Sequence, residues 1–240
     1  MQIHGFSKTT LLDYPEHIAA TVFTGGCNFC CPFCHNGELV LDPGCQPVVS
    51  EEEVLAYLKK RQGILQGVCV TGGEPTLQKD LKEFLQKIKE LDYPVKLDTN
   101  GYRPGVLWEL LREHLIDYVA MDIKASRENY SSAAGLKQID LSRIEESIGI
   151  LKSSGIPYEF RTTAVKGIHT VEEFESLGRW IAGCPVYYLQ SYEENENCLY
   201  RMVQAEENAV PFGAFSREEL ESMARLAGKY VGKVVLRGVE

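Results

Sequence analysis

The sequence predicts an α/β fold with a mostly parallel sheet, and two patterns lead to this prediction. Six short apolar segments recur along the 240-residue chain, at residues 19–23, 67–71, 95–98, 118–122, 158–163 and 186–190. Segments in which apolar residues return every three or four positions, as on one face of a helix, lie between them. Strands that alternate with helices form parallel sheets with right-handed crossovers, because each helix carries the chain back across the sheet.

Several of the expected helices begin at polar residues that suit a helix N-terminus. They span residues 50–61, 79–91, 106–114, 141–153, 170–182 and 216–229. Three of them have the spacing of a capping box, in which a Ser or Thr is followed three positions later by a Glu that can bond back to its backbone. The pairs are Ser50 with Glu53, Thr170 with Glu173 and Ser216 with Glu219.

The composition is that of one globular domain, which we expect over residues 1–240. At 44% hydrophobic and 25% charged residues the chain can bury a large core, and α/β barrels of this length often form a single domain. No apolar run approaches the roughly 18 residues that span a bilayer. The net charge of −9 argues against a nucleic-acid or anionic-membrane partner, since both attract a basic face. With no signal peptide in view, we expect a reducing, cytoplasmic location.

Four cysteines follow the first expected strand within eight positions. They are Cys27, Cys30, Cys31 and Cys34. The C-x3-C-x2-C spacing of Cys27, Cys31 and Cys34 allows three thiolates to bind three corners of one cubic [4Fe–4S] cluster, which leaves the fourth iron without a protein ligand. The triple Cys27, Cys30 and Cys34 has the two gaps reversed, so spacing alone leaves the choice of the middle ligand open.

Two other chemistries would also explain adjacent cysteines. Two C-x2-C pairs could bind zinc, but such pairs usually lie a dozen or more residues apart, and here they abut, which would strain four tetrahedral bonds. A disulfide is disfavoured by the reducing location. The other four cysteines stand singly and are expected to be small buried residues; they are Cys45, Cys69, Cys184 and Cys198. An iron–sulfur site is favoured, with a zinc- or cluster-bearing interaction protein as the non-enzyme alternative.

Glycine-rich or charged segments follow the next four strands as well. They are Thr71-Gly72-Gly73-Glu74-Pro75, Asp98-Thr99-Asn100-Gly101, Asp122-Ile123-Lys124 and Arg161-Thr162-Thr163. In a parallel sheet of this kind functional groups gather at the carboxyl ends of the strands. Glycines let the main chain approach a ligand closely, although a plain turn would also use them. Asp122 and Lys124 point to the same face, either toward a ligand or as a surface ion pair.

Taken in order, these motifs resemble the radical S-adenosylmethionine enzymes, and among them the longer form of the anaerobic ribonucleoside-triphosphate reductase activating proteins. The similar stretches are Gly5 to Pro15, Thr21 to Asn36, Gly72 to Pro75, Met121 to Lys124 and Phe160 to Gly167. The resemblance implies a partial (β/α)6 barrel of the radical SAM type, open at one side so that a protein substrate can enter. It also implies Cys27, Cys31 and Cys34 as the cluster ligands, with Cys30 at a position where the family often has a basic residue.

The resemblance further implies the reaction. A [4Fe–4S] cluster, reduced by a flavodoxin or ferredoxin-type donor, gives one electron to S-adenosylmethionine. The resulting 5′-deoxyadenosyl radical removes hydrogen from a glycine of a partner glycyl radical enzyme, implied to be anaerobic ribonucleotide reductase. No side chain of this chain need act as an acid or a base. A radical enzyme acting on a small molecule is the alternative, and it is disfavoured because little chain is left to build a closed pocket.

The same resemblance assigns residues to the cofactor and to a monovalent cation. The residues implied to contact S-adenosylmethionine are Asn36, Gly72, Gly73, Glu74, Lys124 and Arg161. Among them the Gly-Gly-Glu segment is implied to meet the ammonium group and Lys124 the carboxylate. A strand-end ion pair explains Arg161 equally well. Asp98, Thr99 and Asp122 are the implied cation ligands.

Overall fold

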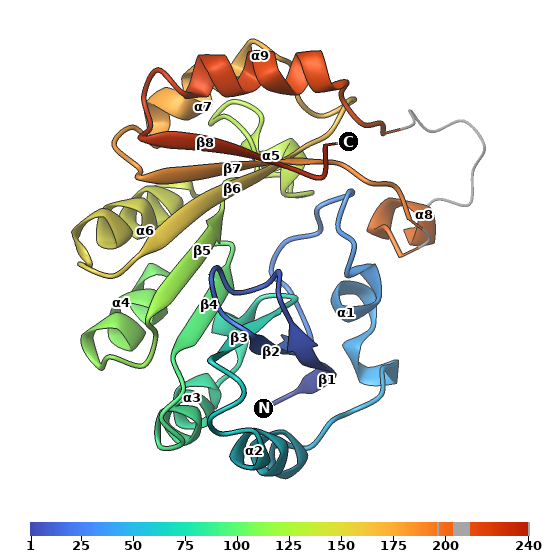
Figure 1. Cartoon of the computed structure of the whole chain (residues 1–240). Coiled ribbons are helices and arrows are strands. Elements are labelled where there is room, and N and C mark those ends of the chain that lie inside the picture. The colour runs from blue at the N-terminus through green and yellow to red at the C-terminus, as the bar shows by residue number, and fades with distance from the viewer. Residues whose placement is uncertain (196, 204–211, 240) are drawn as a thin grey trace.

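The structure is a computed structural model that describes residues 1–195, 197–203 and 212–239. Within these residues eight strands form one sheet in chain order (Figure 1). They are β1 (Ile3–Thr10), β2 (Ala19–Thr24), β3 (Gly67–Gly72), β4 (Val95–Thr99), β5 (Tyr118–Asp122), β6 (Tyr158–Ala164), β7 (Val186–Ser191) and β8 (Lys233–Arg237). Every neighbouring pair from β2 to β8 is parallel, and β1 pairs antiparallel with β2. The expected α/β fold with a mostly parallel sheet is confirmed.

All six expected strands are present, each within one residue of its expected bounds. The two edge strands, β1 and β8, were not expected. Edge strands are covered on fewer sides, so their residues carry a weaker apolar signal: in β1 only Ile3 is buried, and no residue of β8 is. By contrast, the first four residues of β3 are all buried, which produces the continuous apolar run that the sequence shows.

The six expected helices are also present, mostly shortened at their ends. They are α2 (Glu51–Lys60), α3 (Leu81–Lys89), α4 (Pro104–Arg112), α6 (Leu141–Ser153), α7 (Glu173–Trp180) and α9 (Arg217–Ala227). At α9 the capping box is complete: the Ser216 side chain accepts from the Glu219 backbone, and the Glu219 side chain accepts from the Ser216 backbone. At α2 the Ser50 side chain accepts from the Glu53 N–H at 3.1 Å.

Within the described residues, three short α-helices have no counterpart in the sequence analysis. They are α1 (Gly37–Leu41), α5 (Tyr130–Ala133) and α8 (Leu199–Val203). Each has only four or five residues, so none is long enough to show a helical period. In Figure 1, α2, α3, α4 and α6 line the outer side of the curved sheet, whereas α1 and α8 lie together on the opposite side. None of the described helices is both long and apolar enough to cross a bilayer.

Candidate cofactor site

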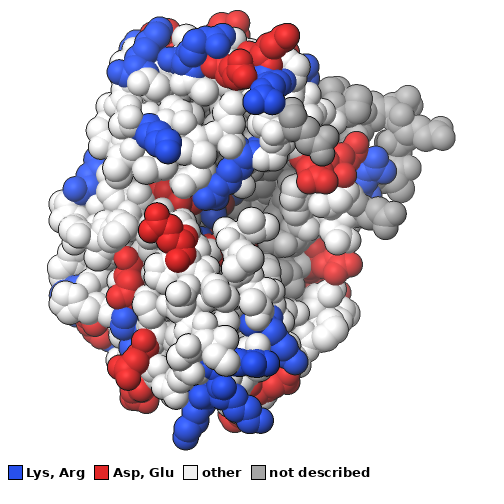
Figure 2. Space-filling model, in the orientation of Figure 1, with Lys and Arg blue, Asp and Glu red and all other residues white. Residues whose placement is uncertain are grey.

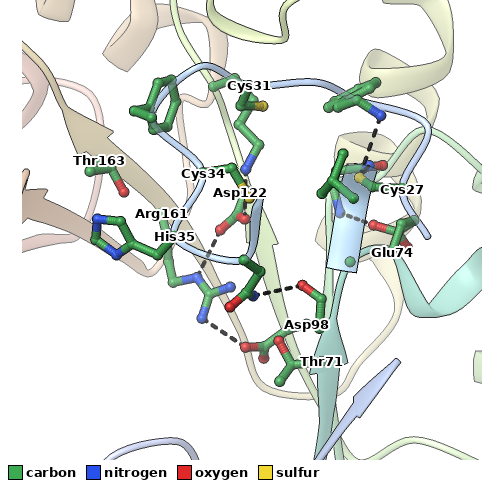
Figure 3. Close-up of a pocket in the computed structure, with 18 of the residues that line it drawn as sticks. Cys27, Cys31, Cys34, His35, Thr71, Glu74, Asp98, Asp122, Arg161 and Thr163 are labelled. Atoms are coloured by element: carbon green, nitrogen blue, oxygen red, sulfur yellow. Dashed lines mark hydrogen bonds and ion pairs between the residues drawn. The ribbon is translucent and has the colours of Figure 1, made fainter. Parts of the chain in front are cut away.

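A cavity of about 300 Å³ lies at the carboxyl ends of the parallel strands (Figure 3). Its wall contains every residue that the sequence analysis placed near a cluster, a cofactor or a cation: Cys27, Cys31, Cys34, Asn36, Gly72, Gly73, Glu74, Asp98, Thr99, Asp122, Lys124 and Arg161. These residues come together because parallel strands end at the same edge of the sheet. Residues that the sequence analysis did not assign also line the cavity, among them Asn100, Thr163 and Ser191.

The four clustered cysteines divide into two groups. Cys31 is buried, Cys27 and Cys34 are half-buried, and all three border the cavity. Cys30 is exposed, and its backbone N–H donates to the carbonyl of Ala134 at 2.9 Å. Spacing alone did not separate Cys30 from Cys31, whereas the structure places only Cys31 in the cavity wall.

The three cavity thiols are not suited to a single ion. Among the residues that the structure describes, no three His, Cys, Asp or Glu side chains converge closely enough to hold one metal ion. In a cubic cluster each thiolate binds a different iron, so the three sulfur atoms need to surround the cluster and need not meet at one point. Burial raises the pKa of the Cys27 and Cys31 thiols to about 12 and also raises the pKa of Cys34. These groups therefore favour the neutral thiol at neutral pH unless a positive charge binds beside them.

The cysteine loop, residues 25–36, is held by a distant segment. This segment, which we call the strap, comprises residues 192–195 and 197–203 and follows β7. The backbone N–H groups of Leu199 and Tyr200 donate to the carbonyls of Cys34 and Pro32, each at 2.9 Å. A ring nitrogen of His35 bonds to the Glu193 carbonyl at 2.7 Å. No motif in the sequence indicated this support.

The Gly-Gly-Glu segment packs against the start of the cysteine loop. Backbone N–H groups of Gly73 and Glu74 donate to the carbonyls of Thr24 and Gly26, both at 2.8 Å. A Cβ on Gly73 would lie 2.1 Å from the Gly26 oxygen, so only glycine fits. These glycines were expected to let the main chain approach a ligand closely. In the structure Gly73 packs closely against the chain's own backbone, and both glycines also border the cavity.

Glu74 follows β3 and joins it to the end of β4 by hydrogen bonds. Its buried carboxylate accepts from the Thr76 backbone and hydroxyl, from the Thr99 hydroxyl at 2.8 Å and from the Asn100 N–H at 2.7 Å. Burial nevertheless raises the pKa of Glu74, because desolvation outweighs these four hydrogen bonds. Glu74 and Thr99 therefore engage each other in the cavity wall.

Five charged side chains form a chain of ion pairs, and four of them line the cavity, whereas Lys96 lies behind its wall. Arg161 donates from Nε to Asp122 at 2.9 Å and from a terminal nitrogen to Asp98 at 3.0 Å. Lys124 donates to the other Asp122 oxygen at 2.9 Å, and Lys96 contacts Asp98. Burial opposes the charge on Asp122, but Arg161 and Lys124 outweigh it and lower the pKa of Asp122 to about 2. The group as a whole carries three positive and two negative charges.

Three consecutive backbone carbonyls, at residues 122–124, are each bound by a side chain from elsewhere. The donors are Tyr130 at 3.4 Å, Thr162 at 2.7 Å and the Nε2 atom of His169 at 2.8 Å. Because Nδ1 of His169 accepts from the Val165 N–H at 3.0 Å, a neutral ring must carry its proton on Nε2. Burial lowers the pKa of His169, which favours that neutral ring. This clamp fixes the backbone that carries Asp122 and Lys124.

On the face drawn in Figure 2, basic and acidic side chains are interspersed along the upper part of the molecule, and basic side chains gather at its lower end. That lower end is where α2 lies in Figure 1. Charge on this face is therefore unevenly distributed even though the chain as a whole is acidic.

Comparison with protein families matches residues 21–181 to the Radical SAM superfamily. Over 241 aligned residues, the chain is 30% identical to a protein of Methanocaldococcus jannaschii whose name proposes a glycyl-radical enzyme activating enzyme. The alignment covers 99% of this chain and 96% of that protein. A protein of Pyrococcus horikoshii whose name proposes a GTP 3′,8-cyclase is also 30% identical, over 64% of this chain and 49% of its own length.

Solved structures share the fold at low sequence identity. Streptococcus suis SuiB bound to the precursor peptide SuiA superposes with a TM-score of 0.67 at 14% identity, over 91% of this chain and 48% of SuiB. A domain of pyruvate-formate lyase-activating enzyme from Bacteroides vulgatus superposes with a TM-score of 0.56 at 18% identity. That match covers 72% of this chain and 99% of the domain.

Proposed function

This chain belongs to the radical SAM superfamily, and from this membership we propose that it activates a glycyl radical enzyme, with anaerobic ribonucleotide reductase as the proposed partner. The observation that carries the proposal is the relative from M. jannaschii, which matches this chain along nearly the whole length of both proteins. The GTP 3′,8-cyclase relative matches over only about half of its own length. A flavodoxin or ferredoxin-type protein is the proposed electron donor.

The cavity fits the cofactors of the superfamily, a [4Fe–4S] cluster and S-adenosylmethionine. Three buried or half-buried thiols border one volume, and we propose Cys27, Cys31 and Cys34 as the cluster ligands. The side-chain nitrogen of Asn28, next to Cys27 in the sequence, is buried and has no hydrogen-bond partner in the described part of the chain, but Asn28 is not part of the cavity wall. When bound, the cluster and cofactor supply one-electron chemistry that generates a carbon-centred radical.

The protein's own groups exclude water and orient the cofactor. Phe29 and Phe33 are almost fully buried and form apolar parts of the wall. Asn36 donates to the Gly72 carbonyl at 2.9 Å and so joins the cysteine loop to the Gly-Gly-Glu segment. Among the described residues Lys124 uses one of its three donors, on Asp122, and the other two are available to a carboxylate. These contacts support the proposed sites for the ammonium and carboxylate groups of the methionine moiety.

The proposed activity is tested with the reconstituted, anaerobic protein and a glycyl radical enzyme. Alone, with dithionite or flavodoxin, the protein should cleave S-adenosylmethionine slowly, because the radical lacks a productive hydrogen donor. With the correct partner a doublet glycyl signal should appear by electron paramagnetic resonance, and deuterium placed on the target glycine should enter 5′-deoxyadenosine. Failure to recover that deuterium would exclude direct abstraction. Fast conversion of a small metabolite without any partner would favour the alternative activity.

Lys124→Ala should weaken S-adenosylmethionine binding without removing the cluster. A charge-assisted hydrogen bond contributes about 1.5–3 kcal/mol, which corresponds to roughly a ten- to hundredfold loss of affinity. Calorimetric titration of the cofactor, with iron content measured on the same sample, checks this result. Lys137→Ala is the matched control, because Lys137 is exposed and lies outside the cavity wall. Equal affinities for the two variants would reduce Lys124 to a structural role.

A further inference from the structure

Arg161 lies between the two carboxylates that were expected to bind a monovalent cation (Figure 3). We infer that this chain binds no monovalent cation at Asp98 and Asp122, and that the guanidinium of Arg161 supplies the positive charge there as a permanent part of the protein. The inference deepens the proposed function, and the part of it that concerns cofactor affinity rests on that function.

The oxygens of both carboxylates are already in use. Asp122 receives Arg161 Nε on one oxygen and Lys124 on the other, each at 2.9 Å. Asp98 receives a terminal nitrogen of Arg161 at 3.0 Å on one oxygen and the ammonium of Lys96 on the other. A sodium or potassium ion would therefore have to displace a protein cation or bind beside it, and like charges at such distances repel strongly in a poorly solvated site.

The third expected ligand, Thr99, already uses its hydroxyl within the protein. The Thr99 hydroxyl donates to Glu74 at 2.8 Å and accepts from the Gly101 N–H at 3.1 Å. Both bonds lie in the interior, since Thr99 is buried. The hydroxyl thus serves the junction of β3 and β4 with its proton and one of its two lone pairs.

Arginine suits this task because its charge and geometry are fixed. Its guanidinium is charged at any ordinary pH and presents several N–H donors in one plane, so it can bond two carboxylates at once. The side chains of Arg161 and Asp98 are each only 13% exposed and that of Lys96 is 2% exposed, whereas Asp122, at 30%, is the more accessible carboxylate. With Arg161, Lys96 and Lys124 the five charges already sum to one positive, and an added cation would increase that imbalance.

Replacement of Arg161 by an uncharged residue should allow a cation to bind between Asp98 and Asp122. Without it Asp98 and Asp122 would face each other with only one lysine apiece, and the two carboxylates already disfavour each other's ionisation. A site of that kind attracts small cations from solution. Arg161→Gln is the appropriate change, because Gln keeps a polar side chain in place but carries no charge.

The test compares reconstituted wild-type protein, Arg161→Gln and Arg127→Gln in potassium, sodium and tetramethylammonium chloride at equal ionic strength. Arg127 is an exposed arginine paired with Glu145 at 2.9 Å, so its variant controls for the loss of a surface ion pair. Melting temperature is measured without S-adenosylmethionine, and cofactor affinity is measured by calorimetry.

Wild type and Arg127→Gln should show the same melting temperature and the same affinity in all three salts. For Arg161→Gln, potassium or sodium should raise the melting temperature by several degrees in a saturable manner. Its cofactor affinity should change roughly fivefold or more between potassium and tetramethylammonium. A saturable rise in the wild-type melting temperature with potassium or sodium would overturn the inference. So would an Arg161→Gln protein whose melting temperature and cofactor affinity are the same in all three salts. If that variant does not fold, the wild-type measurement still decides.

The melting measurements do not involve a partner or a reaction. If the wild-type melting temperature does not depend on the cation but the protein activates no glycyl radical enzyme, the proposed function is contradicted and this inference stands. If the protein activates the enzyme but requires potassium, the inference is contradicted and the proposed function stands.

Discussion

Replacement of Cys27, Cys31 or Cys34 by Ala is expected to abolish the iron–sulfur cluster and all cleavage of S-adenosylmethionine. Each change removes one of the three thiols that border the cavity, and the fourth iron has no protein ligand that could compensate. Iron and sulfide analysis after anaerobic reconstitution should fall from about four of each per chain to almost none. Loss of any one of these thiols should leave the circular dichroism of the fold unchanged.

Cys30→Ala is the matched control, because Cys30 belongs to the same loop but is exposed. It should retain the cluster and most of the activity. The opposite pattern, in which Cys30→Ala loses the cluster and Cys31→Ala retains it, would reverse the ligand assignment. Recovery of about one zinc and no iron from the wild type would refute the iron–sulfur site altogether.

Gly73→Ala is expected to destabilise the protein by about 3 kcal/mol and to disrupt the cavity. The new methyl group would lie 2.1 Å from the Gly26 carbonyl oxygen, so two backbone segments must separate. These segments are the Gly-Gly-Glu turn and the start of the cysteine loop, and they are joined by hydrogen bonds at 2.8 Å. Denaturant unfolding measures the loss of stability, and cluster content measures the effect on the loop.

Gly149→Ala is a control that is expected to increase the stability of the protein instead of decreasing it. Gly149 lies in the middle of α6 with open space around its Cα, so a methyl group there meets nothing within 4 Å. Alanine at this position should stabilise the helix by about 1 kcal/mol. If Gly73→Ala proved as harmless as Gly149→Ala, the close packing of the two segments would not be a requirement of the fold.

The inner strands and the location of the site could be predicted because each depends on local sequence. A strand such as β3, buried along most of its length, must be apolar throughout, and the polar residues that follow such strands meet at one edge of the sheet. The capping residues Ser216 and Glu219 act within one turn, so their pattern is visible in the sequence. The edge strands β1 and β8 were not predicted, because partial exposure weakens their apolar pattern.

The connections within the site could not be predicted, because they join residues that are distant in the chain. Arg161 and Asp98 lie on strands β6 and β4, which are separated by β5, and their side chains meet at 3.0 Å. His169 has no motif around it, yet it binds the backbone carbonyl of Lys124. The expectation that all four lone cysteines are buried is confirmed for Cys69, Cys184 and Cys198 but is wrong for Cys45, which is exposed; a preference of the residue type does not determine the burial of one position.

The strap also bears on how the protein is made. His35 and Glu193 are 158 positions apart, and the bonds from Leu199 and Tyr200 span a similar stretch of chain. The family match ends at residue 181, before the strap begins. Because a chain emerges from the ribosome N-terminus first, its cysteines appear long before the segment that supports their loop. A cluster delivered during synthesis would meet a loop with one side unsupported, so we expect the metal centre to form only after the last fifth of the chain has been made.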